Sequence, residues 1–326
     1  MGGDHGLNTT IPAALEAVKK DSNLQIVLVG DHHKVKRALD RYSKVKKASE
    51  TVAMDESPAD AVRKKKDSSM RVAINLVKDN SVDACVSAGN TGALMATSKF
   101  VLKTVNGVDR PAIVYALPAF NRETKTLSKT YMLDLGANVV CSSEQLFQFA
   151  IMGSILAASS KGIAEPRVSL LNIGEEEMKG LDNIKNASKL LQNCDFINYK
   201  GYVEGKHIFD DATDVVVCDG FVGNVSLKTM EGTLRLIEAL IKKSVTEGSW
   251  LMKLPTIMAL PIFKRMKKSM NLDSFNGASL LGLTGIVVKS HGSASSNAFE
   301  TAIFEAVKEV KHNIPKTIQE SIEKVL

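Results

Sequence analysis

The sequence predicts an α/β protein with a doubly wound, mostly parallel sheet flanked by helices. Strand-like and helical segments alternate along all 326 residues, which favours parallel strands joined by helices. The apolar runs at 24–30, 167–172 and 214–218 lack polar alternation, as expected for strands buried on both faces. Aromatic residues make up 5% of the chain, and this aliphatic composition suits such cores. No linker divides the chain, so we expect residues 1–326 to form a single unit.

Local signals justify the individual elements in chain order. A glycine-rich loop opens the chain at residues 1–6. Asp31 and Ser57-Pro58 mark helix starts, because short polar side chains cap helices and proline fits the first turn. In the last helix, Ile318, Ile322 and Val325 share one face. We expect helices at about 12–20, 32–44, 57–79, 90–103, 142–160, 181–192, 225–247, 295–312 and from 315 onward, and strands at 24–30, 82–87, 112–117, 131–135, 167–172, 195–199, 214–218 and 285–289.

The composition bounds the class of protein. The chain has 42 Lys and Arg residues against 36 Asp and Glu, a net charge of +6 that slightly favours acidic partners. With so few aromatic residues it does not indicate a nucleic-acid partner. The cysteines show neither a CxxC motif nor zinc spacing, so we expect reduced thiols and no metal site at Cys85, Cys141, Cys194 and Cys218. No secretory signal or membrane span is visible, from which we expect a cytoplasmic protein.

Residues 214–229, DVVVCDGFVGNVSLKT, combine an apolar strand, a glycine-rich turn and the start of a helix. Residues 83–93 repeat the spacing D-x-x-V-x-x-G-x-x-G of this stretch. Backbone N–H groups and the helix dipole at such a turn favour an anion, commonly phosphate. For one loop alone, the alternative is an ordinary strand-to-helix connection with polar caps. The candidate phosphate-binding residues are Ser87, Gly89, Asn90, Thr91, Gly92, Asp219, Gly220 and Gly223.

Four polar side chains are candidates for catalysis. Lys289 and His291 end a third apolar run, GIVVKSHGSA, at residues 285–294. Lys179 follows three glutamates, and Asn224 lies in the turn at 219–224. Ligands sit outside the carboxyl ends of strands in open α/β sheets, so three such loops could converge on one cleft. The alternatives are a surface charge pair for Lys179, a helix cap for Asn224 and an uninformative surface histidine.

Several enzyme classes lack their usual marks. The chain has no GxxxxGK[ST] loop, no GxGxxG after a strand, no HExxH and no GxSxG. These absences argue against ATP, dinucleotide, metalloprotease and serine hydrolase sites. We therefore expect no cofactor, and loops that serve inorganic phosphate or a phosphorylated substrate.

The segment at 248–272, GSWLMKLPTIMALPIFKRMKKSMNL, contains the only tryptophan, five basic residues and no acid. Apolar side chains beside basic ones suit the surface of an anionic membrane. The alternative is a helical hairpin packed in a dimer contact. We favour contact with a membrane or an acidic carrier protein, and the candidate contact residues are Leu254, Met258, Lys264, Arg265, Lys267 and Lys268.

Eight sequence blocks together resemble the PlsX family of phosphate acyltransferases. They are MGGDHG, VRKKKDSSM, VSAGNTGALMA, LDLGAN, LLNIGEEEMKG, VVVCDGFVGNVSLKT, FNGASLLGL and GIVVKSHGSA, and they extend from residue 1 to about 310. The resemblance implies a two-lobed fold like that of phosphotransacetylase and the isocitrate/isopropylmalate dehydrogenases. We expect a protruding helical segment near 248–272.

The resemblance also implies an activity and partners. Family members transfer a fatty acyl group from acyl carrier protein to inorganic phosphate, and the acyl phosphate serves phospholipid synthesis. They are homodimers that associate peripherally with an anionic membrane surface, and a glycerol-3-phosphate acyltransferase is a downstream partner. Two alternatives stay open, which are a phosphotransacetylase-type enzyme that uses acyl-CoA and a non-catalytic, membrane-recruited scaffold for lipid enzymes.

The chain departs from the family pattern at its start. Family members carry a short apolar strand before the MGGDHG loop, whereas this sequence begins at the Met of that loop. We therefore expect a strand upstream of Met1 that is missing from the chain as given.

Overall fold

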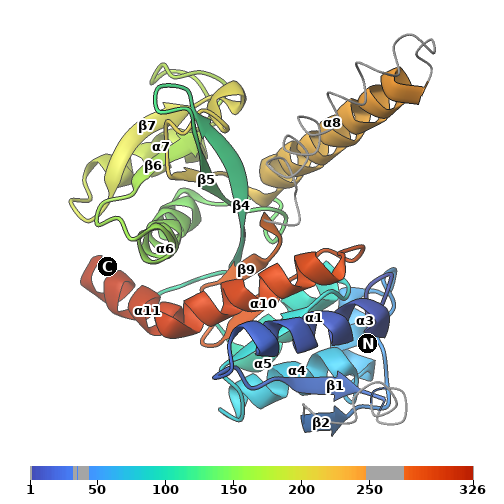
Figure 1. Ribbon diagram of the computed structural model, residues 1–326. Helices are drawn as coiled ribbons and strands as arrows, with labels where there is room; N and C mark the ends of the chain where they lie inside the picture. The colour runs from blue at the N-terminus through green and yellow to red at the C-terminus, as the bar shows by residue number, and fades with distance from the viewer. Residues whose placement is uncertain (1, 32–34, 36–43, 247–274, 326) are drawn as a thin grey trace.

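The computed structural model describes residues 2–31, 35, 44–246 and 275–325. Two groups of elements lie one above the other, and helix α8 extends away from both (Figure 1). The lower group contains α1 (Leu7–Lys20), β1 (Val27–Gly30), β2 (Lys44–Lys47), α3 (Pro58–Lys64), α4 (Ser69–Lys78), β3 (Ala84–Ser87), α5 (Thr91–Leu102), β9 (Ala278–Leu281), β10 (Ile286–Lys289) and α10 (Ser296–Lys311). The upper group contains β4 (Ala112–Asn121), β5 (Thr126–Leu133), α6 (Ser143–Lys161), β6 (Arg167–Leu171), α7 (Asp182–Gln192), β7 (Asn198–Val203), η1 (Gly205–His207), β8 (Val215–Val217) and the start of α8 (Gly220–Thr246), with α11 (Ile314–Val325) packed below α6.

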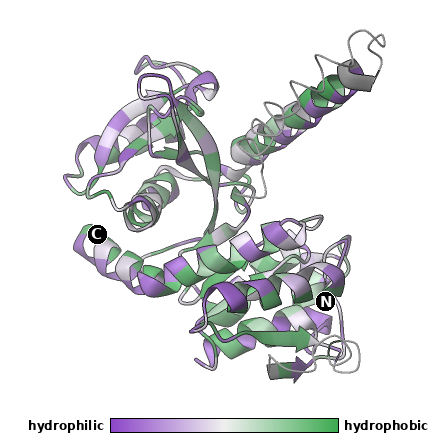
Figure 2. Ribbon diagram, in the orientation of Figure 1, coloured by the Kyte–Doolittle hydropathy of each residue, from purple (hydrophilic) through white to green (hydrophobic). Residues whose placement is uncertain are grey.

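One eight-stranded sheet runs through both groups in the order β3-β10-β9-β4-β5-β8-β6-β7. Among these described strands, four neighbouring pairs are parallel (β3/β10, β5/β8, β8/β6 and β6/β7) and three are antiparallel (β10/β9, β9/β4 and β4/β5). The prediction of an α/β fold with a mostly parallel sheet is confirmed. The long β4/β5 hairpin joins the two groups, and β4 is hydrophobic along most of its length (Figure 2).

Helices cover both faces of the lower part of the sheet. Val86 of β3 packs toward Ala17 of α1 and Phe299 of α10. Its neighbour Cys85 packs on the opposite face, with Ile74 of α4. This alternation follows from the two-residue period of a strand and explains why both side chains are apolar. The carboxyl ends of β3 and β10 therefore lie between two helical layers.

The strands in the upper part of the sheet are also covered on both faces. Val215 and Val217 of β8 pack against α6, which is buried along most of its length, including Phe149. Val216 faces the other side and joins the cluster that also contains Cys85 of the lower group. This continuous apolar cluster crosses from one group to the other. The three consecutive valines at 215–217 thus serve two hydrophobic cores at once.

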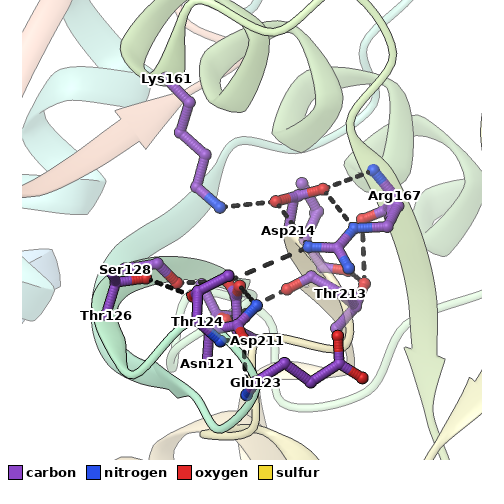
Figure 3. Close-up of polar contacts among 12 residues, drawn as sticks. Asn121, Glu123, Thr124, Thr126, Ser128, Lys161, Arg167, Asp211, Thr213 and Asp214 are labelled. Atoms are coloured by element: carbon purple, nitrogen blue, oxygen red, sulfur yellow. Dashed lines mark hydrogen bonds and ion pairs between the residues drawn. The ribbon is translucent and has the colours of Figure 1, made fainter.

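A network of charges ties together the amino ends of β6 and β8 (Figure 3). The carboxylate of Asp214 accepts from Lys161 Nζ at 2.6 Å and from the backbone N–H and Nε of Arg167, both at 2.9 Å. Asp211 lies beside it, 4.0 Å from Arg167, and accepts from the Ser128 hydroxyl. Because this end of the sheet is opposite to the carboxyl ends of the strands, we assign the network to stability.

The structure corrects several expected elements. The helix expected at 57–79 is two helices, because Ser68 caps α4 by accepting from Arg71 N–H and Asp67 is drawn to the backbone of Ser49. Strands β2 and β9 were not expected. The short strand β9 lies between Gly277 and Gly282, both with positive φ. Glycines are typical of turns, so the sequence pattern around them did not indicate a strand.

A cavity of about 950 Å³ lies between β1 and β3. Among the described strands, β1 pairs with β2 alone and β3 with β10 alone, so each has a second edge without a partner. The lining mixes polar groups with apolar side chains such as Ile26, Leu28 and Val86, and Gly2 lies beside Gly89. The strand expected upstream of Met1 stays a prediction.

The segment expected to contact a membrane lies outside the described residues. Leu254, Met258, Lys264, Arg265, Lys267 and Lys268 all fall within 247–274. In the described part of the chain, no helix is both long and apolar enough to cross a membrane.

Candidate active site

Three loops meet at the carboxyl ends of β3 and β10. Ser290 N–H donates to Ser87 O at 2.9 Å, and Asp4 N–H donates to Gly292 O at 2.9 Å. Gly3 has φ +83°, and a Cβ there would lie 3.0 Å from carbonyl oxygens of both neighbouring loops. Only glycine fits this conformation and approach without strain. The loops at 2–6, 87–92 and 289–294 therefore form one surface, which we call the lower site.

Lys289 is the buried cation of the lower site. Its residue is 7% exposed, and Nζ donates to the carbonyl oxygen of Ser290. Burial lowers the pKa of Lys289 to about 8, with the carboxylate of Asp4 opposing this shift and the charge of Lys228 adding to it. An ammonium group with this pKa is largely charged at neutral pH and can neutralise a bound anion.

His291 is held by hydrogen bonds on both its backbone and its ring. Its backbone N–H donates to Asn276 Oδ1 at 3.1 Å, and Asn276 is itself fixed because Nδ2 donates to Ser290 Oγ and Ala298 O, both at 2.7 Å. Nδ1 accepts from the backbone N–H of Ser293 at 3.2 Å. A backbone N–H can only donate, so the neutral imidazole carries its proton on Nε2.

The charges of α8 act on this histidine. Removal from water lowers the pKa of His291, Glu231 opposes the shift, and Lys228 and Arg235 add to it. Lys228, Glu231 and Arg235 follow the spacing of one helix face, and Lys228 is paired with Glu231 at 2.8 Å. The same α8 face thus influences His291 and, through Lys228, Lys289. The net effect of burial and these charges lowers the pKa of His291 and so favours the neutral imidazole.

The side chain of Asn90 makes hydrogen bonds that stabilise the fold. Its Oδ1 accepts from Ala93 N–H at 2.9 Å and so caps α5, while Nδ2 donates to the carbonyl oxygens of Met54 and Glu56 at 2.8 and 3.0 Å. Nearby, Gly89 N–H donates to Ser87 Oγ at 3.2 Å. Thr91 and Gly92 are exposed in the first turn of α5, where N–H groups have no intrahelical partners. Their N–H groups therefore stay available to a ligand.

The second predicted phosphate loop lies in the upper group. Asp219 Oδ1 accepts from Val222 N–H at 2.8 Å, and Gly220 N–H donates to Asn138 O at 2.8 Å. A Cβ on Gly223 would lie only 1.9 Å from Asp134 O, so this glycine is needed for close packing. Asn224 is exposed and lies beside Gly136. The loop packs on the segment that follows β5.

Lys179 is also in the upper group. It lies on the loop after β6, is exposed, and pairs with Glu176 at 2.8 Å. The hydrogen bond from Lys179 to Glu176 raises the pKa of the lysine and lowers that of the glutamate.

The structure thus places the predicted site residues in two sets joined by α8. Ser87, Gly89, Asn90, Thr91, Gly92, Lys289 and His291 gather in the lower site, whereas Lys179, Asp219, Gly220, Gly223 and Asn224 lie in the upper group. Sequence reasoning missed Asp4, Asn276 and Lys228, which lie near Lys289 and His291 but far from them in sequence. The one available signal was the clustering of Asp4 and His5 in the glycine-rich opening loop.

Comparison with known proteins decides the family. A family model described as "Fatty acid synthesis protein" matches residues 1–317. The chain belongs to this family. The "Phosphate acyltransferase" of Francisella philomiragia subsp. philomiragia is 88% identical over 339 residues, covering 100% of this chain and 97% of the relative. The protein of the same name from Francisella tularensis subsp. novicida is 86% identical with the same coverage. The resemblance to the PlsX family is confirmed.

Solved structures support the fold of this fatty acid synthesis family member. A phosphotransacetylase from Streptococcus pyogenes has a TM-score of 0.57 at 17% identity and covers 92% of this chain and 91% of its own. A branched-chain phosphotransacylase from Enterococcus faecalis V583 has a TM-score of 0.55 at 14% identity, with coverage of 93% and 96%. At such identities the likeness concerns the fold, and it confirms the expected phosphotransacetylase-like architecture.

Proposed function

We propose that the protein transfers a fatty acyl group from acyl carrier protein to inorganic phosphate and so forms acyl phosphate for phospholipid synthesis. The observation that carries this proposal is full-length membership of a family whose close relatives are named phosphate acyltransferases. The lower site adds chemical support, because it combines an exposed helix N-terminus, a buried ammonium group and an imidazole with a defined proton. We further propose that residues 1–326 work as a single unit, which the apolar cluster spanning both groups supports.

The reaction needs no side-chain nucleophile. A phosphate oxygen attacks the thioester carbonyl carbon, an oxyanion forms, and the C–S bond then breaks as the carbonyl returns. The products are acyl phosphate and the carrier thiolate, which takes up a proton. The enzyme must hold phosphate against the carbonyl and stabilise the developing negative charge.

Residues of the lower site suit these tasks. We assign phosphate binding to the Lys289 ammonium and to the N-terminal turn of α5 with Thr91 and Gly92. Nε2–H of His291 is suited to donate to the oxyanion or to the leaving thiolate, since Nδ1 already accepts from Ser293. Asn276 positions His291 through its backbone, and Asp4 balances the charge of Lys289. The upper loop, with Asn224 and Lys179, is assigned to the thioester side of the same site.

The binding partners beyond phosphate and the thioester are also proposals. Helix α8 extends away from both groups of elements (Figures 1 and 2). It carries basic residues, including Lys228 and Arg235, which suit an acidic carrier protein. Its exposed Leu236 and Ile237 suit a contact with a second copy. We propose a homodimer, peripheral association with anionic membrane through residues 250–270, and a glycerol-3-phosphate acyltransferase as consumer of the product. If the membrane proposal holds, Leu254→Glu with Met258→Glu releases the protein from anionic vesicles and leaves the protein folded; retention on the vesicles contradicts it.

The test of the activity compares thioester donors. The purified protein is incubated with acyl carrier protein thioester or with the matching acyl-CoA, each with and without phosphate. We expect phosphate-dependent thiol release that is faster with the carrier protein. A preference for acyl-CoA would favour a phosphotransacetylase-type enzyme, and no release from either donor would favour a scaffold.

A further inference from the structure

Six large apolar side chains are exposed around the carboxyl ends of three adjacent strands. They are between 62% and 84% exposed, and they are Val139, Val140, Ile173, Met178, Leu181 and Phe221. We call this set the apolar rim. Single exposed apolar residues are ordinary on protein surfaces, but a contiguous group marks a binding surface.

The apolar rim is contiguous because its three loops are joined. Strands β5, β8 and β6 are neighbours in the sheet, so the segments that follow them leave from adjacent points. Gly220 N–H, at the start of α8, donates to Asn138 O at 2.8 Å. Asn183 Nδ2, at the start of α7, donates to Cys141 O at 2.9 Å. These bonds hold Val139 and Val140 between the loop after β6 and the first turn of α8.

The rim is also continuous with the proposed reaction centre. Phe221 lies two residues after Asp219 of the upper phosphate-type loop. From Phe221, α8 leads to Lys228, whose charge acts on both Lys289 and His291. Seven residues of helix span about 10 Å. An acetyl group held at His291 would not cover this distance, whereas a fatty chain would.

The charge near the apolar rim distinguishes between the ligands that could bind to it. The loop after β6 carries three consecutive exposed glutamates, Glu175, Glu176 and Glu177, against one lysine, Lys179. This local excess of negative charge repels an anionic membrane. An uncharged hydrocarbon chain experiences no such repulsion and gains from contact with the apolar side chains.

We infer that the apolar rim binds the acyl chain of the thioester substrate and sets the preference of the enzyme for long chains. The inference rests on the proposed function and adds the surface on which the chain lies. Contact with the rim predicts that kcat/KM rises with chain length by up to about fourfold per methylene, the equivalent of about 0.8 kcal/mol.

The experiment measures kcat/KM for a short-chain and a long-chain acyl carrier protein thioester at saturating phosphate. The variant is Ile173→Ser with Met178→Ser, both at exposed positions where the substitutions leave the core intact. The matched control is Phe120→Ser with Leu127→Ser, an exposed apolar pair that faces each other across the β4/β5 hairpin, at the amino end of β5. We expect the long-to-short ratio of kcat/KM to fall at least 10-fold in the rim variant and to stay within twofold of wild type in the control.

An unchanged ratio in the rim variant overturns the inference, as does an equal loss on both chain lengths, which would mean that the rim contacts the carrier arm. Loss of vesicle binding, or dissociation of an oligomer in sedimentation, with an unchanged ratio would assign the rim to a membrane or to a second copy. Inactivity of the wild-type protein on every thioester contradicts the proposed function instead, so the two failures are distinguishable.

Discussion

Ser293 fixes the proton of His291. Its backbone N–H donates to Nδ1 of the imidazole at 3.2 Å, and its hydroxyl lies 2.8 Å from the same nitrogen. In the neutral ring the remaining proton is therefore on Nε2. The two residues are separated by only one glycine, so the arrangement is local and depends on the tight loop after β10.

This arrangement predicts the effect of removing the imidazole. His291→Ala should lower kcat by about 10²-fold or more, because a hydrogen-bond donor to the transition state is lost. The matched control is His312→Ala, which removes an exposed histidine at the end of α10 and should leave kcat within twofold of wild type. Equal kcat values for the two variants would remove His291 from the reaction.

Lys289 predicts a pH dependence at the alkaline side. Burial lowers its pKa to about 8, so the ammonium form is present below this pH and is lost as the pH rises through it. We expect kcat/KM for phosphate to fall above pH 8 in wild type. In Lys289→Arg the guanidinium stays charged, and the fall should move to higher pH. A wild-type profile that stays flat to pH 10 would contradict phosphate binding by the Lys289 ammonium.

The contacts of Asp214 should make the free energy of unfolding decrease in acid. Burial opposes its ionisation, but hydrogen bonds from Arg167 and Lys161 outweigh it and hold the pKa of Asp214 at about 2, below the ordinary 3.8 (Figure 3). The folded-state pKa is depressed, so the stabilisation, about 2.5 kcal/mol, is present above pH 3.8 and is lost as the pH falls toward 2. Asp214→Asn should therefore unfold at lower denaturant concentration at pH 7.

The control for this measurement is Asp182→Asn, whose carboxylate is 92% exposed and pairs only at the surface with Lys185. Urea unfolding of both variants at pH 7 and pH 3 separates the two positions. If Asp214→Asn and Asp182→Asn have the same midpoint at pH 7, the network in Figure 3 does not stabilise the amino ends of β6 and β8.

Much of this fold could be predicted because the signals are local. The valines at 215–217 predicted a strand buried on both faces, and Ser142 opens α6 with a capping box. Ile318 and Ile322 in the last helix are buried as their spacing predicted. Strand β2 escaped prediction because its sequence, KVKK, is mostly basic, and β9 because its four residues lie between two glycines of positive φ. The break before α4 depends on a contact between Asp67 and the distant Ser49.

The site was less predictable because its geometry depends on distant segments. The residue types at the carboxyl ends of β3, β8 and β10 were visible in the sequence. Two contacts in the site join residues that are distant in the sequence. Asn90 donates to carbonyl groups within residues 53–56, and Asn276 accepts from the backbone N–H of His291. Periodicity has no information about such contacts, so the sequence suggested candidate residues without their division into two sets.

The central claim is that phosphate itself attacks the thioester. The most direct measurement follows acyl phosphate by phosphorus NMR while the free thiol of acyl carrier protein is titrated in the same reaction. We expect one acyl phosphate for each thiol released, and no release when phosphate is omitted. Thiol release without acyl phosphate would identify a thioesterase, and this result would contradict the account.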